Sequence, residues 1–161
     1  MAIANETKVD FDAVDRQLLR RLMHDGRATW ADLADSLGLT APAVAQRVRR
    51  LEVRGVIKQF AAWVAPEAVA PVAAYVAVQL ARPELRERFR RHIAELEQIQ
   101  ECMHIAGDHD YLLKVRCGSL AELEALVSTT LAKAPGVGRM RTNVVLSAVK
   151  ETPVLPLPAV A

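Results

Sequence analysis

A cluster of cations in the N-terminal half is the chemically most distinctive stretch of the sequence. Between residues 40 and 60 there are five basic side chains against one acid, Glu52, which gives a local net charge of +4. The basic residues are Arg47, Arg49, Arg50, Arg54 and Lys58. Arg and Lys form charge-assisted hydrogen bonds with phosphate oxygens, so this concentration of charge favours a phosphate-bearing partner.

All of these cations except Lys58 lie on a segment that the sequence predicts to be a helix over residues 40–55. Thr40 suits the N-cap, Pro42 is tolerated in the first turn, and Gly55 suits the position just past the end. Helical spacing divides the segment into an apolar stripe and a polar, basic side. The stripe consists of Val44, Val48 and Leu51, and the polar side carries Ala43, Gln46, Arg47 and Arg50.

A second, shorter helix is predicted directly before this one. Residues 29–32, Thr-Trp-Ala-Asp, have the form of a capping box, and Gly38 provides the stop. A short helix, a turn containing Gly and a second helix form a helix-turn-helix, whose second helix enters the major groove of DNA. This context outweighs the alternative that the arginines are only a solvated face. The candidate DNA-binding residues are Thr40, Ala43, Gln46, Arg47, Arg49, Arg50, Arg54 and Lys58.

Within that set we expect different roles. Arg47 and Arg50 share a face and are predicted to contact DNA, and Gln46 is a candidate base reader. Arg49, Arg54 and Lys58 are predicted to lie on phosphates or to take part in helix packing. The expected partner is double-stranded DNA.

Composition places the chain among globular proteins. The 161 residues are 52% hydrophobic and 25% charged, enough for one medium domain or two small ones, and the net charge of +2 is modest. Cys102 and Cys117 are not spaced as a CxxC pair, and the N-terminus has no apolar signal region. Reduced thiols and a cytoplasmic location are therefore expected.

One apolar stretch, residues 61–81, is long enough to span a bilayer. Pro66, Glu67 and Pro71 interrupt it and argue against a membrane span. We expect no membrane contact.

The remaining N-terminal elements complete a winged helix-turn-helix. Residues 1–11 are expected to be a mobile lead-in, and residues 12–24 show helical spacing with a stop at Asp25-Gly26. The β-prone segments 56–60 and 62–65 suggest a two-stranded wing. An extended linker is expected over residues 66–71, because residues before proline are disfavoured in the α region.

The second half changes period and predicts alternating strands and helices. Strands are expected at 72–81, 102–106, 111–117 and 139–149, and helices at 84–98 and 119–133. The order β-α-β-β-α-β is that of a ferredoxin-like sandwich, with two helices on one face of an antiparallel sheet. The other face carries Tyr75 and Ala77, which a partner subunit is expected to cover.

The predicted fold class is therefore α+β. The predicted domains are a winged helix-turn-helix over residues 1–65, a linker over 66–71, a ferredoxin-like domain over 72–152, and an extended or disordered tail over 153–161.

The chain as a whole resembles the leucine-responsive and asparagine-regulator (Lrp/AsnC) family of transcription factors. The segments that carry the resemblance are DAVDRQLLRRLMHDGRAT, LADSLGLT, QRVRRLEVRGVIK, IQECMHIAGDHDYLLKV and PGVGRMRTNVVL. The resemblance implies a DNA-binding domain joined to an amino-acid-sensing RAM domain, and homodimers paired through their sheets. It also implies octamers or other assemblies of dimers, and no cofactor other than a small-molecule effector.

The resemblance places the effector between subunits, near Gly107, Asp108, His109 and Asp110 and the start of the last strand. Backbone N–H groups at the Gly107 turn could hold an α-carboxylate, and Thr142 could add a hydroxyl. Either Asp108 or Asp110 could accept from the α-ammonium group. Family members vary at the position of His109, which is expected to bear on effector selectivity.

Two rival interpretations concern Cys102, His104 and His109. These residues are a possible soft-metal set, but no fourth ligand is evident, and a buried cysteine with two surface histidines is the favoured alternative. The two-domain build also resembles siroheme decarboxylases, in which His104 and His109 could act as acid and base. The intact arginine helix argues against an enzyme.

Overall fold

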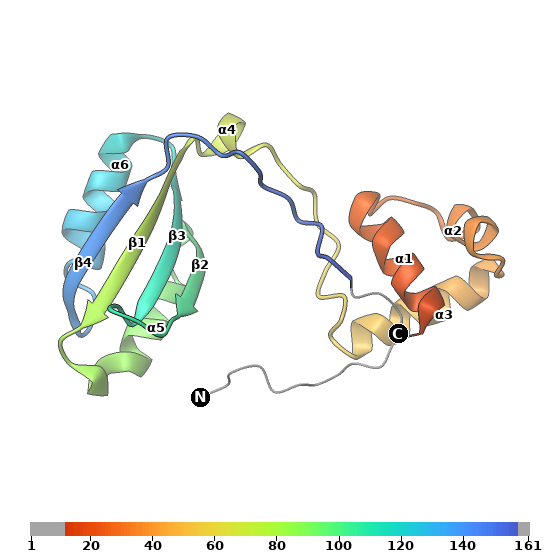
Figure 1. Ribbon diagram of the computed structural model, residues 1–161, viewed down its shortest axis with the longest axis horizontal. Coiled ribbons are helices and arrows are strands. Elements are labelled where there is room, and N and C mark those ends of the chain that lie inside the picture. Colours follow the sequence, from red (N-terminus) through yellow and green to blue (C-terminus); the bar gives the residue numbers. More distant parts are fainter. Residues whose placement is uncertain (1–11, 158–161) are drawn as a thin grey trace. The chain divides into compact units, whose positions relative to one another are not determined.

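The computed structural model describes residues 12–157, so the expectations for residues 1–11 and for the last four residues of the tail fall outside the described chain. The described chain divides into two compact units, each with its own apolar core (Figure 1). The first unit contains residues 12–63 together with residues 150–157, and the second is Val64–Val149.

The first unit is a three-helix bundle, as predicted. Its helices are α1 (Ala13–His24), α2 (Trp30–Leu37) and α3 (Ala41–Val53). Their apolar stripes meet in one buried cluster formed by Leu18, Leu19, Leu22, Leu33, Ala34, Val44, Val48 and Leu51. This core holds the helix-turn-helix segment against α1.

The predicted wing is wrong at the level of secondary structure, because residues 56–65 contain no strand. The backbone after α3 is used to cap that helix instead: Val56 N and Ile57 N both donate to Leu51 O, at 2.9 and 3.2 Å. A two-stranded ribbon without further partners is only marginally stable. In the single chain the β-prone side chains of Phe60, Trp63 and Val64 therefore stay exposed.

The end of the chain belongs to the first unit. Residues 150–157 have no regular secondary structure, in line with the expected extended tail. The half-buried side chain of Leu157 packs against the three-helix core, which the sequence did not predict.

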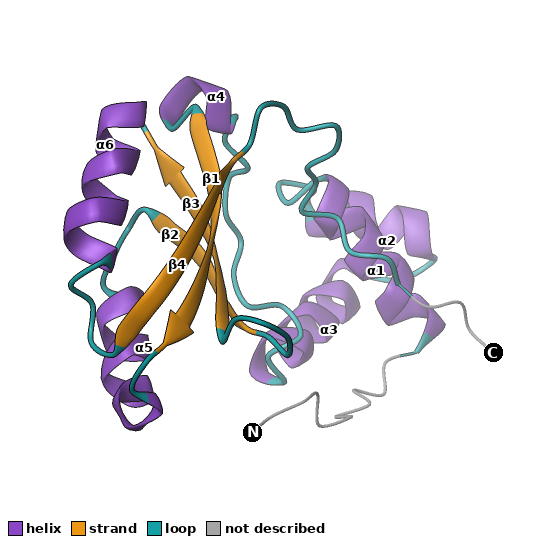
Figure 2. Ribbon diagram, turned by 60° about the vertical axis from the view of Figure 1, so that its left-hand side comes forward, coloured by secondary structure: helices purple, strands orange, loops and turns teal. Residues whose placement is uncertain are grey.

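The second unit is the predicted ferredoxin-like sandwich. Figures 1 and 2 show helices α5 and α6 on one face of a four-stranded sheet. The sheet order is β2-β3-β1-β4, and all three strand pairs are antiparallel. The strands are β1 (Val72–Leu80), β2 (Ile99–His104), β3 (Tyr111–Cys117) and β4 (Val137–Val144). The helices are α4 (Pro66–Val69), η1 (Pro83–Leu85), α5 (Arg86–Ala94), α6 (Leu120–Ala125) and its π-helical continuation η2 (Leu126–Leu131).

Strand alternation sorts the side chains of the sheet between its two faces. Val76, Val78, Leu113 and Val115 are completely buried under the helices, together with Phe89 of α5. The opposite face, here called the open face, carries Tyr75, Ala77 and their cross-strand neighbours Leu112, Lys114 and Arg141. Tyr75 is 41% exposed in the single chain.

Several boundaries in this unit differ from the sequence prediction, among them that of β2, which was predicted at 102–106 and is Ile99–His104. The predicted linker is not extended: Pro66–Val69 form a helical turn closed by Ala70 N donating to Pro66 O, and only the preceding Ala65 has extended backbone angles among the residues that cap this turn. Helix α5 ends at Ala94, because the chain turns to enter β2 at Ile99. Strand β4 ends near residue 145, since β1 begins at Val72 and provides no partner beyond it.

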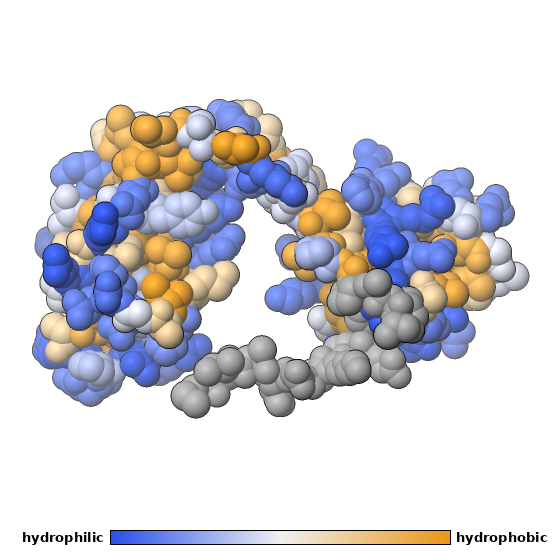
Figure 3. Space-filling model, viewed as in Figure 1, coloured by the Kyte–Doolittle hydropathy of each residue, from blue (hydrophilic) through white to orange (hydrophobic). Residues whose placement is uncertain are grey.

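On the face drawn in Figure 3, polar and apolar groups are mixed, and apolar groups gather in places. Figure 3 shows apolar atoms over the end of the second unit that carries α4. The exposed large hydrophobic residues near this end are Val69, Leu120, Val144 and Leu146. No helix in the described chain is long and apolar enough to cross a membrane, and residues 61–81 instead supply α4, β1 and the segments beside them.

Candidate nucleic-acid interface and effector cleft

Local hydrogen bonds define the helix-turn-helix. Thr29 Oγ1 accepts from Asp32 N at 3.2 Å, and Thr40 Oγ1 accepts from Ala43 N at 3.4 Å, so both predicted N-caps are present. Gly38 ends α2 with φ of 64°, a left-handed conformation that other residues adopt at a cost. The turn between α2 and α3 is therefore short and well defined.

Helix α3 turns one face inward and presents the other to solvent. Val44, Val48 and Leu51 are buried, as the apolar stripe predicted. The outward face, defined here as Pro42, Gln46, Arg49 and Val53, is exposed along its length. These positions recur at i, i+4, i+7 and i+11, so their side chains project on one side of the helix.

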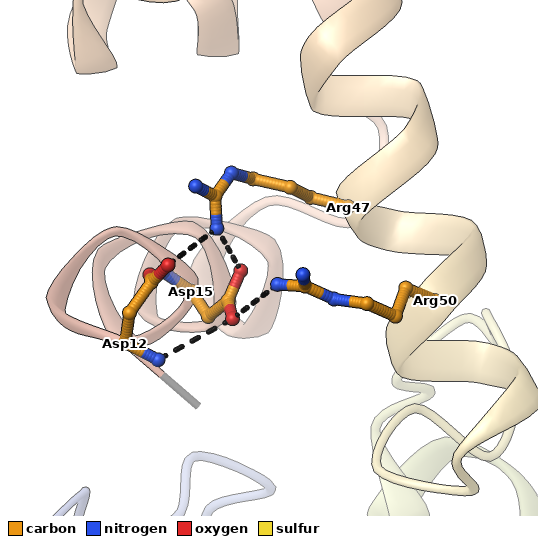
Figure 4. A network of polar contacts seen from close by, with 4 residues as sticks. All are labelled: Asp12, Asp15, Arg47 and Arg50. Carbon is orange, nitrogen blue, oxygen red and sulfur yellow. Dashed lines mark hydrogen bonds and ion pairs between the residues drawn. The ribbon is translucent and has the colours of Figure 1, made fainter. Parts of the chain in front are cut away.

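Arg47 and Arg50 lie beside this outward face and are directed toward α1 (Figure 4). Arg47 Nη1 donates to Asp12 Oδ2 and to Asp15 Oδ1, both at 2.7 Å, and Arg50 Nη2 donates to Asp15 Oδ2 at 2.7 Å. The Asp15 side chain is 1% exposed, whereas those of Arg47 and Arg50 are 26% and 49% exposed. The two arginines predicted to contact DNA are thus ion-paired within the unit.

Asp12 and Asp15 also cap α1. Asp15 N donates to Asp12 Oδ1 at 2.8 Å, and Asp12 N donates to Asp15 Oδ2 at 3.4 Å, which is a capping box. The Asp15 backbone N–H and the Arg47 guanidinium lower the pKa of Asp12 below its usual value. Hydrogen bonds to Asp12 and Asp15 raise the pKa of Arg47.

Sequence reasoning missed Asp15, although a signal for it was present. Asp15, Leu18, Leu19 and Leu22 follow the helical spacing of one face, and all four are buried. An acid on an apolar stripe needs a cationic or hydrogen-bonding partner. The excess of arginine on α3 was the available source of that partner.

The other candidate cations stay on the surface. Arg49, Arg54 and Lys58 are exposed, and none of them forms an ion pair with the described residues. Arg54 provides the C-cap of α3 through its backbone N–H. Arg49, on the outward face, is the best placed of the three to meet a partner lying along α3.

In the second unit, the predicted effector residues separate into different roles. Asp110 is engaged with β1: its Oδ2 accepts from Leu80 N at 2.8 Å, and its own N–H donates to Val78 O at 2.9 Å. The β1–β4 register shifts between Gln79 and Leu80, so the carboxylate satisfies an amide near an irregular point of the ladder. Asp110 is therefore structural in this geometry.

A shallow cavity of about 360 Å³ lies beside this hairpin. It is lined by Gln79, Asp108, His109, Arg139, Met140 and Arg141. It thus brings one carboxylate, one imidazole and two guanidinium groups to the same place. Gly107 precedes them with φ of 142°, a conformation that favours glycine.

Thr142 does not line the cavity. Thr142 is paired with Val76, whose side chain is buried under the helices, so Thr142 belongs to the helix-covered side of the sheet. It lies three positions along β4 from Arg139. Arg139 and Arg141, which the sequence did not single out, line the cavity instead. Strand alternation would have assigned them to the open face once the register was known.

The possible metal set does not come together among the described residues, which contain no group of three His, Cys, Asp or Glu side chains suited to a metal ion. His104 stacks on Tyr111, with ring centroids 5.1 Å apart, while His109 lines the cavity. The expectation of a buried cysteine is wrong for Cys102, which is exposed on the edge strand β2. Cys117 is the buried one.

A capped helix-turn-helix followed by a ferredoxin-like domain is the architecture of a DNA-binding regulator with a separate ligand-binding module. Models of two families match the chain: the AsnC-type helix-turn-helix domain over residues 11–52, and the Lrp/AsnC ligand binding domain over residues 73–155.

Individual relatives match over most of their length. The leucine-responsive regulatory protein of Haemophilus influenzae is 42% identical over 144 residues, covering 88% of this chain and 87% of the relative. A Neisseria meningitidis transcriptional regulator solved with L-Met has a TM-score of 0.85 at 28% identity, covering 91% of this chain and 97% of that one. A feast or famine regulatory protein from M. tuberculosis, complexed with L-methionine, has a TM-score of 0.83 at 35% identity, covering 91% and 99%.

The chain therefore belongs to the Lrp/AsnC family of transcriptional regulators. The family predicted from the sequence is confirmed, and so are the helix-turn-helix and the ferredoxin-like ligand-binding fold. The relatives above are regulators, and the comparisons give no support to the decarboxylase alternative.

Proposed function

We propose that this protein binds double-stranded DNA in the cytoplasm as a homodimer or an assembly of dimers, and that a free amino acid modulates this binding. The observation that carries the proposal is helix α3, which is capped, held by a core and exposed along Gln46 and Arg49. In this scheme the DNA-binding domain is residues 1–65 and the linker between the two domains is residues 66–71. The domain that binds the effector and forms the oligomer is residues 72–152, and residues 153–161 are the tail.

The outward face of α3 is well suited to the major groove. Gln can pair with the N6 and N7 edge of adenine, and Arg with guanine or a phosphate, so Gln46 and Arg49 supply both kinds of contact. Other candidate residues flank these two and would contact the sugar-phosphate backbone of the DNA, namely Thr40, Ala43, Arg54 and Lys58. Contact of Arg47 and Arg50 with DNA stays a prediction; in the single chain Arg47 pairs with Asp12 and Asp15, and Arg50 pairs with Asp15.

The DNA proposal is tested by fluorescence anisotropy with a duplex selected from a randomised pool by the wild-type protein. Gln46→Ala is expected to weaken binding to the selected duplex by about tenfold or more and to spare a scrambled duplex. Arg91→Gln, at an exposed position of the second unit, is the control and should bind both duplexes normally. A wild-type protein that shows no preference for any selected duplex would refute sequence-specific binding.

Dimerisation is proposed through the open face of the sheet. Tyr75 and Met103 are 41% and 50% exposed there, with half-buried Leu112 between their strands. A second copy of the face would remove this apolar surface from water. Light scattering of the wild type at micromolar concentration should give the molar mass of a dimer or a larger assembly. Tyr75→Arg should shift the molar mass toward that of a monomer. A monomeric wild type would contradict dimerisation through the open face.

The proposed effector site is the cavity beside residues 107–110, completed by a neighbouring subunit. An amino acid needs an anionic group for its ammonium and cationic groups for its carboxylate, which Asp108 and the pair Arg139 and Arg141 offer. His109 would then lie near the amino-acid side chain and influence selectivity. Two structural relatives, each solved with L-methionine, support this ligand class.

A thermal-shift screen of the proteinogenic amino acids tests the site. A ligand at a hundred times its dissociation constant should stabilise the fold by about 2.7 kcal/mol. Asp108→Asn should abolish the response and Glu95→Gln, at an exposed position outside the cavity, should preserve it. If no amino acid changes the Tm, the oligomer distribution or the affinity for DNA, the sensing role is refuted.

The effect of the ligand on DNA would pass through the assembly. The cavity and α3 belong to different units of the chain. A ligand can shift only an equilibrium between arrangements for which it has different affinities. The expected readout is therefore a change in oligomer distribution that parallels the change in DNA affinity.

A further inference from the structure

Asp15 is the buried charged residue of the described chain that DNA binding and effector sensing leave unexplained. It lies in the first turn of α1, where the positive end of the helix dipole favours a carboxylate. Both of its oxygens accept from α3, Oδ1 from Arg47 and Oδ2 from Arg50. Its two partners are 32 and 35 residues away in the sequence.

The arginines span a gap that the backbones leave open. The backbones of α2 and α3 run close together, whereas α1 and α3 approach each other less closely. The buried stripe of α3 sets which side of the helix faces the core, but apolar contacts are not directional and tolerate small rotations of α3 about its own axis. Two charge-assisted hydrogen bonds to one fixed carboxylate are directional and oppose that rotation.

The geometry points to Asp15 as a positioning residue for DNA recognition. Through its ion pairs with Arg47 and Arg50, Asp15 holds α3 in the orientation that meets DNA. The inference rests on the proposed DNA-binding function. Asp15 fixes the exact direction in which the outward-facing Gln46 and Arg49 project, and it keeps Arg47 and Arg50 away from phosphates. Selectivity for a DNA sequence then depends on a residue that touches no DNA.

The salt dependence of binding separates this role from a direct contact. The slope of log affinity against log salt concentration is negative for duplex DNA, and each phosphate neutralised by a cation adds about 0.9 to its magnitude, which is the quantity called the slope here. Arg49→Gln should lower the slope by about 0.9 if Arg49 lies on a phosphate. Arg47→Gln should leave the slope unchanged, because its charge is already neutralised by Asp12 and Asp15.

Asp15→Asn gives the signature expected of a positioning residue. Release of Arg47 and Arg50 should raise the slope on a scrambled duplex by about 0.9 or more, while preference for the selected duplex falls by about tenfold. If the variant only reduced the amount of folded protein, the apparent affinity for both duplexes would fall by the same factor, and the salt-dependence slope would not change. Asp35→Asn is the matched control, because Asp35 is an exposed acid of α2 that pairs with no described residue and changes the charge equally.

The experiment uses the full chain and the selected and scrambled duplexes named above. If Asp15→Asn showed the same salt-dependence slope and the same preference for the selected duplex as Asp35→Asn, the inference would be overturned. The proposed DNA-binding function would not be affected by that result. A slope reduced by about 0.9 in Arg47→Gln would also overturn it, by making Arg47 a phosphate contact. If Asp15→Asn is unfolded at the assay temperature, Arg47→Gln decides the question. A wild type that prefers no duplex refutes the proposed function itself.

Discussion

The two units of the chain deal with polar groups in opposite ways. The sheet unit has a core cluster of apolar side chains and cysteine, with ion pairs such as Lys114–Glu101 outside it. The three-helix unit is smaller and places the buried carboxylate of Asp15 at the edge of its core. A buried ion pair is weak support for stability, but its directional hydrogen bonds can specify one arrangement. The comparison suggests a test: a change in the apolar core of the sheet unit should cost mainly stability, whereas a change at Asp15 should also affect the direction in which α3 presents its side chains.

The largest expected effect is in the sheet unit. Phe89→Ala removes a fully buried ring that contacts Tyr111, with centroids 4.9 Å apart, and should cost about 3–5 kcal/mol. Denaturant unfolding followed by far-UV circular dichroism measures the loss. Trp30 and Trp63 belong to the helical unit, so their emission should report a separate, less affected transition. The exposed Leu120→Ala is the control, and an equal loss there would contradict the role of the core.

A smaller effect is expected from Asp15→Asn on the stability of the helical unit. Removing a charge from a buried pair is costly, but both arginine partners can turn toward water, so we expect about 2 kcal/mol. Tryptophan emission during urea unfolding is the readout. Asp35→Asn should change stability by less than about 0.5 kcal/mol. A neutral Asp15→Asn would show that the buried carboxylate does not hold the bundle together.

The two acids near the cavity should differ in the same kind of measurement. Asp110→Ala leaves the Leu80 amide without its acceptor and should cost about 1–2 kcal/mol. Asp108→Ala removes an exposed side chain and should change stability by less than about 0.5 kcal/mol. Unfolding without added amino acid measures both. Equal losses would contradict the division into a structural and a ligand-facing acid.

The smallest expected effect depends on pH and involves Asp12. Its pKa is lowered in the folded state, so its contribution is present above the unfolded value of about 3.9 and is lost as pH falls through the folded value. Because the side chain is half exposed, we expect only about 0.2–1 kcal/mol. The Tm of the wild type should therefore fall more steeply below pH 4 or so than that of Asp12→Asn. Parallel curves would show that the capping box adds nothing through charge.

Local signals predicted much of the fold. The caps at Thr29 and Thr40, the stop at Gly38 and the strand Tyr111–Cys117 all agree with the structure. Each depends on interactions within a few residues, or on an alternation that needs only one buried face. The β-prone segments 56–60 and 62–65 failed as strands, because a strand also needs a partner that the single chain does not supply.

The candidate sites were predicted less well than the elements that carry them. Helix α3 was predicted to be the DNA-binding element, yet the sequence could not show that Arg47 and Arg50 hold an acid of α1. The connection at residues 107–110 was predicted to hold the effector, yet the sequence could not show that the partners of Asp110 lie on β1, some 30 residues away. In both cases the missing information was which side chain reaches across between elements.

The sequence by itself determined the family, the three-helix order of the first unit, the β-α-β-β-α-β order of the second and the amphipathic face of the main helices, because periodicity and capping act along the chain. Only the tertiary structure decided which arginines of α3 form ion pairs within the unit and which face solvent. Arg47, Arg49 and Arg50 are the same residue type within one turn of α3, but Arg47 and Arg50 meet Asp15 while Arg49 faces solvent. The reason is geometric: the helical rotation of about 100° per residue directs neighbouring side chains to different surroundings, and the packing of α1 determines which of them finds a buried carboxylate.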